Sequence, residues 1–377
     1  MNTTAKRNHL ALDLLSFISI VFLSYILQDF LIPLIFAIIL SVLIYPIVQF
    51  FESRLYFNRI VSISIAIIIF TFIIFAIFVL IGIQFEEIMN KSDAYYKQIG
   101  QKLTPLLAQT EQSTGINSKD IVGDGNLGVK EIVKKNSNKI VNFITTSGSI
   151  LGDFVLSPLY MFLFLLYRNF LVSFIYKITT GISTKQHTRV ILQQLYKVQQ
   201  NYLLGLVSVM AIVGLLNSLG LLILGIEHPF FFGFLCALLL LVPYIGIIIG
   251  SLLPALIALA TKDSYWYAIG VIGIFGFIQF IEGNFITPKI TGSKVSLNAF
   301  VSILSIVLFS MLWGIPGMIL ALPITASLKV LFDHSERMKP IGFLLGEAKQ
   351  KYFSIKTMNR LKTWKKIRTK KNKKLIN

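Results

Sequence analysis

Long apolar runs separated by short polar turns dominate this chain of 377 residues. Eight of the runs approach or exceed the length that one helix needs to cross a bilayer, about 18 residues. They cover residues 10–28, 30–51, 60–85, 149–167, 203–226, 229–260, 264–281 and 299–332. Because lipid offers no partner to free backbone groups, such runs form helices. The pattern predicts an all-α polytopic membrane protein with about eight transmembrane helices.

Two of the runs, 229–260 and 299–332, are longer than one crossing requires and contain prolines at 243, 254, 316 and 323. Proline removes a backbone donor and clashes with the preceding turn. Each run could therefore be a kinked helix that crosses once or a re-entrant pair, and the sequence leaves both open. Irregular backbone at membrane depth survives only inside protein or beside a water-filled cavity. We therefore expect broken or re-entrant helices in the C-terminal half, and residues 203–333 to form a membrane transport core.

Composition agrees with a membrane protein, and the distribution of charge indicates its orientation. Hydrophobic residues make up 55% of the chain and charged residues 14%, against about 25% charged in soluble proteins. The net charge is +18, and Lys and Arg gather before the first run, between the second and third, in 168–202 and in the tail. These residues favour the cytoplasmic side of a membrane. With eight crossings, both termini are expected in the cytoplasm.

Four regions flank the core. Residues 1–85 are expected to hold membrane helices 1–3, and residues 149–202 membrane helix 4 with a helix at the cytoplasmic interface, or else an ordinary connector. Residues 86–148 carry two apolar stripes at helical spacing around a glycine-rich turn, which predicts an extracytoplasmic amphipathic arm. Residues 334–377 form a basic cytoplasmic tail. We expect the tail to bind membrane lipid, anionic lipid above all, and expect no nucleic-acid partner.

Three clusters could line a transport path. In the first, Pro243, Tyr244 and Gly246 would free backbone carbonyls that an ion or a polar solute could use. The third, with Gly314, Gly317 and Pro323, repeats this logic and suggests a helical hairpin or a broken helix. The alternative for both is a kink packed by neighbouring helices, since Pro and Gly are common in membrane helices.

The second cluster holds the one carboxylate inside the C-terminal apolar region, Glu282. Gln279 lies three residues earlier, so the two side chains share a helix face, and Asn284 adds a polar group. A carboxylate at membrane depth is costly and marks a candidate functional site. Burial would favour the protonated form of Glu282, and a nearby cation, Lys289 or Lys294, would favour the charged form. A carboxyl group balanced in this way could exchange a proton for a cation or solute. The alternative is a paired carboxylate at the end of a span with a structural role.

The sequence shows no enzyme motif and no cofactor site. It lacks the His-Glu-x-x-His zinc motif, the Gly-x-Ser-x-Gly elbow and the phosphate-binding loop. The four histidines are scattered, and the single cysteine, Cys236, permits no disulfide within the chain. We therefore expect a protein that is not an enzyme and has no metal or cofactor. Any transport would then be channel-like or driven by an ion gradient.

At these clusters the chain resembles the AI-2E family of bacterial membrane proteins, the autoinducer-2 exporter-like transporters. The matching pieces, in order, are Tyr202-Leu-Leu-Gly205, Gly225, Pro243-Tyr-x-Gly246, Gln279-x-x-Glu282, Pro288, Gly292, Gly314-x-x-Gly317 and Pro323. The resemblance implies a secondary transporter in the bacterial inner membrane that forms a homo-oligomer. In one departure, Asn298-Ala299 stands where many relatives carry a His-Pro pair, so coupling here could differ.

The leading functional hypothesis is a secondary transporter that uses Glu282 and Gln279. It would export a small polar solute or exchange a monovalent cation for protons. The alternatives are a non-transporting membrane scaffold or partner-binding protein, in which the arm and the basic tail do the work, and a passive channel. The substrate, the coupling ion and the direction of transport do not follow from the sequence.

Overall fold

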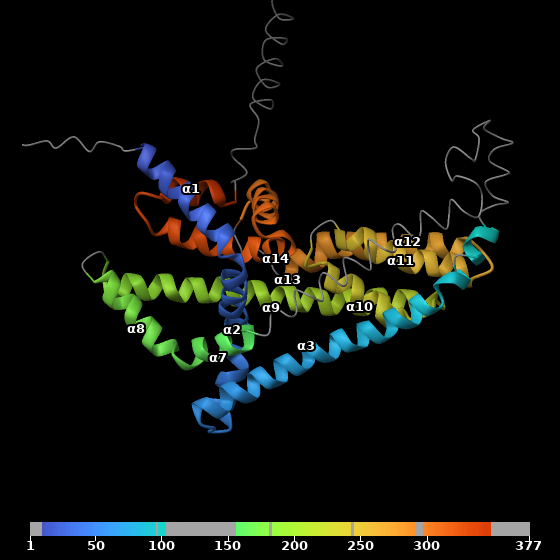
Figure 1. Cartoon of the computed structure of the whole chain (residues 1–377), viewed down its shortest axis with the longest axis horizontal. Coiled ribbons are helices and arrows are strands. Elements are labelled where there is room, and N and C mark those ends of the chain that lie inside the picture. The colour runs from blue at the N-terminus through green and yellow to red at the C-terminus, as the bar shows by residue number, and fades with distance from the viewer. Residues whose placement is uncertain are drawn as a thin grey trace, which may run out of the picture.

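A computed structural model describes residues 10–95, 97–102, 156–180, 183–242, 245–290 and 297–347 (Figure 1). Every element named within these residues is helical, which confirms the expected all-α membrane fold. The helices are α1 (Leu10–Ile26), α2 (Gln28–Arg54), α3 (Arg59–Asn90), α7 (Leu156–Leu166), α8 (Arg168–Thr179), α9 (Lys185–Ile223), α10 (Pro229–Leu239), α11 (Ile245–Thr261), α12 (Trp266–Ile281), the π-helix η1 (Glu282–Ile286), α13 (Thr287–Ile290), α14 (Ala299–Asp333) and α15 (Lys339–Leu345).

The number of membrane crossings differs from the expectation. Among the described residues, five helices are long and apolar enough to span a bilayer: α2, α3, α9, the continuous stretch from Trp266 to Ile290, and α14. The pair α7 and α8, bent by 68°, would make a sixth if it is one span. The helices α1, α10 and α11 are apolar but shorter. The count of eight is not confirmed, because the first run gives a short helix, the run 149–167 ends in a bent pair and the run 229–260 is divided into two short helices.

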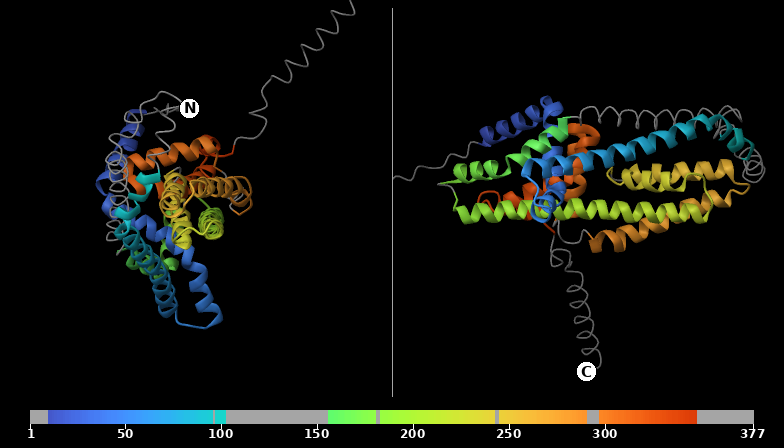
Figure 2. Two further views of the ribbon diagram at one scale, coloured as in Figure 1. Left: turned by 90° about the vertical axis from the view of Figure 1, so that its right-hand side faces the viewer. Right: turned by 90° about the horizontal axis from the view of Figure 1, so that it is seen from below.

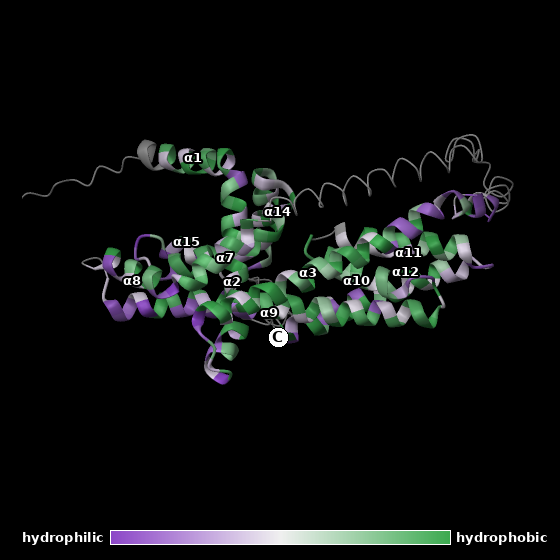
Figure 3. Ribbon diagram, turned by 60° about the horizontal axis from the view of Figure 1, so that its bottom comes forward, coloured by the Kyte–Doolittle hydropathy of each residue, from purple (hydrophilic) through white to green (hydrophobic). Residues whose placement is uncertain are grey.

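The long helix α9 organises the molecule. It begins at the Thr184 cap, whose hydroxyl accepts the His187 N–H at 3.2 Å, and continues without a break through residues 202 and 203, where we had placed a boundary. Its C-terminal half packs against α10 and α12, and its N-terminal half against α8 and α14 (Figure 1). Polar residues gather at the start of α9 and beyond the end of α3, with apolar helices between (Figure 3).

The run 229–260 forms a helical hairpin. The helices α10 and α11 lie antiparallel, so that Gly246 faces Leu239 and Gly250 faces Cys236. A Cβ on Gly246 would lie 2.2 Å from the Leu239 carbonyl oxygen, so the close approach requires glycine there. Seen from below, the hairpin lies between α3 and α9 (Figure 2). Pro254, one of the expected breaks, lies inside α11.

The segment that follows α3 contacts the chain just before α10 and at the end of α11, the two ends of this hairpin. The Tyr95 hydroxyl donates to Glu227 Oε2 at 2.9 Å, in the turn between α9 and α10. The Lys102 ammonium donates to the carbonyls of Leu259, Ala260 and Lys262 at the end of α11. The chain therefore leaves α9 and α11 at the same end of the bundle. Of the expected extracytoplasmic arm, 86–148, only residues 86–95 and 97–102 are described, and the rest lies outside the described residues.

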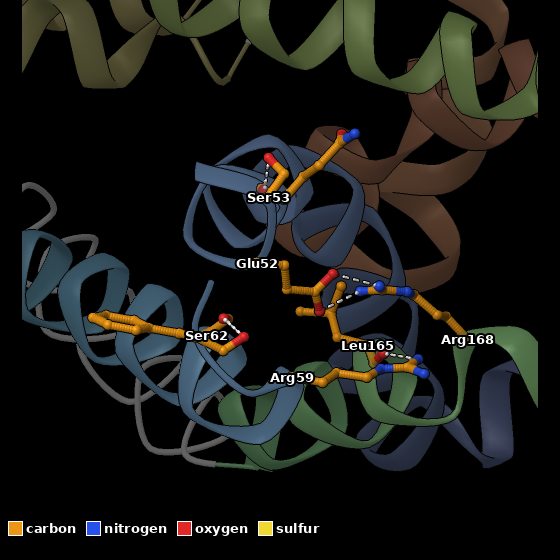
Figure 4. A network of polar contacts seen from close by, with 8 residues as sticks. Glu52, Ser53, Arg59, Ser62, Leu165 and Arg168 are labelled. Atoms are coloured by element: carbon orange, nitrogen blue, oxygen red, sulfur yellow. Dashed lines mark hydrogen bonds and ion pairs between the residues drawn. The ribbon is translucent and has the colours of Figure 1, made fainter. Parts of the chain in front are cut away.

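An ion pair ties the turn between α2 and α3 to the bend between α7 and α8 (Figure 4). Both Arg168 guanidinium nitrogens donate to the Glu52 carboxylate, the shorter bond being 2.7 Å, and Arg59 donates to the Leu165 carbonyl at 2.8 Å. The Arg168 guanidinium also lies over the Tyr45 ring, 5.2 Å from its centroid. A bidentate pair of this kind fixes the relative position of the two elements.

Candidate transport site

Glu282 lies where α12 changes into the π-helix η1. The Thr287 N–H donates to the Glu282 carbonyl, five residues back, instead of four. Gly283 is a weak helix former, and the Asn284 amide donates to the Phe280 carbonyl at 2.8 Å. Side-chain bonds of this kind compete with regular helix geometry. Single π-helical turns are rare in proteins as a whole, and those that occur are often found at functional sites.

The Glu282 carboxylate accepts hydrogen bonds from two uncharged side chains. Gln279 Nε2 donates to Oε2 at 2.5 Å, and Thr287 Oγ1 donates to Oε1. Lys289, one of the two cations expected beside it, is exposed, and no Lys or Arg among the described residues forms an ion pair with Glu282. The other, Lys294, lies outside the described residues. Neutral donors therefore hold this half-buried carboxylate.

Glu282 shares a helix side with residues that pack on α9. Ile278 and Ile286, four residues before and after it, pack with Val209 and Val213. Residues four apart lie on the same side of a helix. Glu282 therefore lies on the side of its helix that packs on the middle of α9.

Among the described residues, the other predicted path residues do not form one constellation with Glu282. Asn284 is exposed and bonds its own helix, and Pro288 is exposed in α13. Gly246 supports the hairpin. Pro243, Tyr244 and Gly292 lie outside the described residues.

The cluster on α14 contains the break that we expected, at a glycine and not at a proline. Gly314 has φ 61° and ψ −137°, which divides α14, whereas Pro316 and Pro323 lie within helix. A Cβ on Gly317 would meet the Phe309 carbonyl oxygen, so glycine permits the close contact after the break. Asn298 caps α14 by accepting the Val301 N–H at 2.8 Å. Its amide also donates to the Leu344 and Gly346 carbonyls.

Two buried amides on α9 were not predicted from the sequence. Gln199 Nε2 donates to the Pro323 carbonyl and to Ser327 Oγ, each at 2.6 Å. Its Oε1 and the Asn217 Oδ1 are buried and have no hydrogen-bond partner in the described part of the chain. A buried acceptor left unpaired costs about 1–3 kcal/mol. The only sequence signal was their spacing of 18 residues, five helical turns, within an apolar pattern.

A pocket of about 190 Å³ opens between α9 and α14, next to Gln199 along the chain. Its polar lining is Gln194, Lys197, Lys329 and Asp333, with Lys329 Nζ 2.5 Å from an Asp333 carboxylate oxygen. The histidines at 187 and 334, far apart in sequence, have ring centroids 5.4 Å apart. Among the described residues, no group of three or more His, Cys, Asp or Glu side chains could hold a metal ion.

Comparison with known proteins agrees on one family. A family model described as AI-2E family transporter matches residues 14–337. YhhT of Escherichia coli (strain K12) is 23% identical over 347 residues, which cover 91% of this chain and 95% of that protein. YrrI of Bacillus subtilis (strain 168) is 34% identical over 139 residues, 37% of this chain and 39% of that protein. Both are provisionally named as transport proteins, without a substrate. The AI-2 transport protein TqsA of Escherichia coli (strain K12) is 22% identical over 322 residues, 85% of this chain and 90% of that protein.

Proposed function

The chain belongs to the AI-2E transporter family, and from this premise we propose that it is a secondary transporter of the bacterial inner membrane. It exports a small polar solute or exchanges a monovalent cation for protons, and the Lys and Arg beside the first run and in the tail favour a cytoplasmic position for both termini. Its relatives are named as transport proteins, which agrees with a role other than catalysis. One relative is named for AI-2, which makes AI-2 one candidate solute among several.

The observation that carries this proposal is the Gln279–Glu282–Thr287 cluster in the π-helical turn of a candidate span. An ionisable side chain inside a span is expensive and is retained for function. Both carboxylate oxygens are satisfied by neutral donors, so protonation or cation binding at Glu282 changes the Gln279 and Thr287 bonds directly.

Replacing Glu282 with Gln tests the role of the carboxylate. In proteoliposomes, Glu282→Gln should abolish flux driven by a proton or sodium gradient while the protein stays folded, because the neutral amide cannot bind and release a proton. The matched control is Glu336→Gln, at a carboxylate whose side chain is 95% exposed. Sodium, lithium, AI-2 and small polar metabolites serve as substrates, with and without a pH gradient.

Two outcomes reject the proposal. Flux and pH dependence unchanged in Glu282→Gln would remove the carboxylate from the coupling. Flux of the unaltered protein that is insensitive to both gradients would identify a passive channel.

A further inference from the structure

Two buried amide oxygens on α9 share one side of the helix. The positions 199 and 217 are 18 residues apart, which is five turns at 3.6 residues per turn. At 1.5 Å per residue they are about 27 Å apart along the axis, close to the thickness of a bilayer's hydrocarbon core. The side chains are 7% and 2% exposed. Along the described chain, Gln199 Oε1 and Asn217 Oδ1 are both without a donor.

Glu282 lies beside the stretch of α9 between these amides. Val209 and Val213, which pack with the residues flanking Glu282, lie in sequence between positions 199 and 217. Along the axis of α9, Glu282 therefore lies between the Gln199 and Asn217 amides. All three groups present oxygen atoms that accept hydrogen bonds or bind cations. Along the described chain the two amide oxygens are unpaired, whereas the Glu282 oxygens accept from Gln279 and Thr287.

The surroundings of Asn217 explain why its oxygen stays unpaired. The neighbouring Ser218 hydroxyl already donates to the Gly214 carbonyl at 2.7 Å. Gly214 packs on Phe234 and Ala237 of α10, so the facing helix presents apolar groups there. At the other amide, both donated bonds of Gln199 go to α14, which leaves only its oxygen free.

We propose that Gln199 and Asn217 are binding positions on either side of Glu282, and that they select permeants which present hydrogen-bond donors. The inference rests on the transport function proposed above and specifies its substrate class. A neutral polyhydroxyl solute donates hydrogen bonds and a monovalent cation binds oxygen directly, whereas an amide oxygen offers an anion neither a donor nor a positive charge.

The test measures concentration-dependent flux through the reconstituted full-length protein for sodium, a neutral polyol and a small carboxylate anion. Replacing Asn217 with Leu keeps the branched shape of the side chain and removes the acceptor. We expect Asn217→Leu to raise the apparent KM of the transported donor about fivefold or more, with a smaller change in maximal rate. The control Ser218→Ala, whose hydroxyl bonds only its own helix, should stay within about twofold of the parent.

If Asn217→Leu does not fold, Asn217→Asp is the second variant with which the inference is tested. The added carboxylate should raise the ratio of sodium flux to polyol flux, because the oxygen then carries charge. If sodium is transported, only the sodium flux should saturate as its concentration rises. If a polyol is transported, only the polyol flux should saturate.

Two results would overturn the inference: an unchanged KM in folded Asn217→Leu, or anion flux through the unaltered protein comparable to flux of the donors. Neither of these two results rejects the proposed function if Glu282→Gln still abolishes coupled flux. Failure of the proposed function is seen separately, as coupled flux that survives in Glu282→Gln.

Discussion

At the scale of single residues, Gly314 carries the sharpest backbone requirement. Its φ of 61° lies in the region that side chains disfavour, although no atom lies within 4 Å of the place where a Cβ would stand. Any cost of a larger residue is therefore conformational and not steric. Gly273 in α12 has equally open surroundings but ordinary helical backbone.

This contrast gives a matched pair of substitutions. Gly314→Ala should destabilise the protein by about 1–3 kcal/mol, because alanine cannot adopt this backbone without strain. Gly273→Ala should be neutral or stabilising by up to about 1 kcal/mol, because alanine is the better helix former. Thermal unfolding in detergent compares the two variants. Equal midpoints for both would mean that Gly314 does not hold the bend of α14.

Also at this scale, the sequence located Glu282 and Gln279 but missed Gln199 and Asn217. A carboxylate in an apolar run stands out by its charge, and a spacing of three residues already places its partner on the same helix side. An amide in an amphipathic pattern does not stand out. Whether its oxygen is paired depends on other helices, and the sequence does not contain that information.

At the scale of elements, the outer end of the α10–α11 hairpin depends on contacts from the segment after α3. Glu87 Oε1 lies 2.9 Å from Lys91 and 3.8 Å from the His228 ring, and Tyr95 bonds Glu227. His228 itself has a left-handed backbone, with φ 54°. Burial, together with the hydrogen bond to Glu227, raises the pKa of Tyr95 to about 12.

The Tyr95 contact predicts a pH-dependent contribution to stability. Because the folded-state pKa lies above the ordinary value of 10.0, the contribution is complete below pH 10 and is lost as the pH rises towards 12. Tyr95→Phe should lower the free energy of unfolding by about 1 kcal/mol at neutral pH. The difference from the parent should shrink above pH 10, as followed by thermal unfolding at several pH values.

The control for this prediction is Tyr56→Phe, because the Tyr56 side chain is 86% exposed. That substitution should leave the midpoint unchanged at every pH. A Tyr95→Phe protein as stable as the parent would show that the Tyr95–Glu227 bond does not hold the hairpin end.

At the scale of the whole molecule, the hairpin changes the topology that the apolar runs predicted. Eight crossings would place Glu227 and Asp263 on opposite sides of the membrane. In the structure, residues 95 and 102 of one segment bind the chain beside both positions, so the two turns lie at the same end. Tyr56 precedes α3, whose 32 residues separate it from that end.

Single-cysteine labelling distinguishes the two topologies. In a Cys236→Ser background, Glu227→Cys and Asp263→Cys should react with an impermeant maleimide from the same side of the membrane. Tyr56→Cys should react from the other side, because α3 crosses between them. All three positions are exposed. Labelling of 227 and 263 from opposite sides would contradict the re-entrant hairpin.

The sequence by itself determined the class of the protein, because apolar runs of this length leave a backbone in lipid no alternative to helices. It also determined the central carboxylate and its first partner, through composition and local helical spacing. Only the tertiary structure decided that the run 229–260 turns back, since that depends on close contacts such as Gly246 with Leu239 and on residues after α3 that hold both ends. It alone decided which polar atoms remain unpaired, because a buried oxygen is free only when no neighbouring helix supplies a donor.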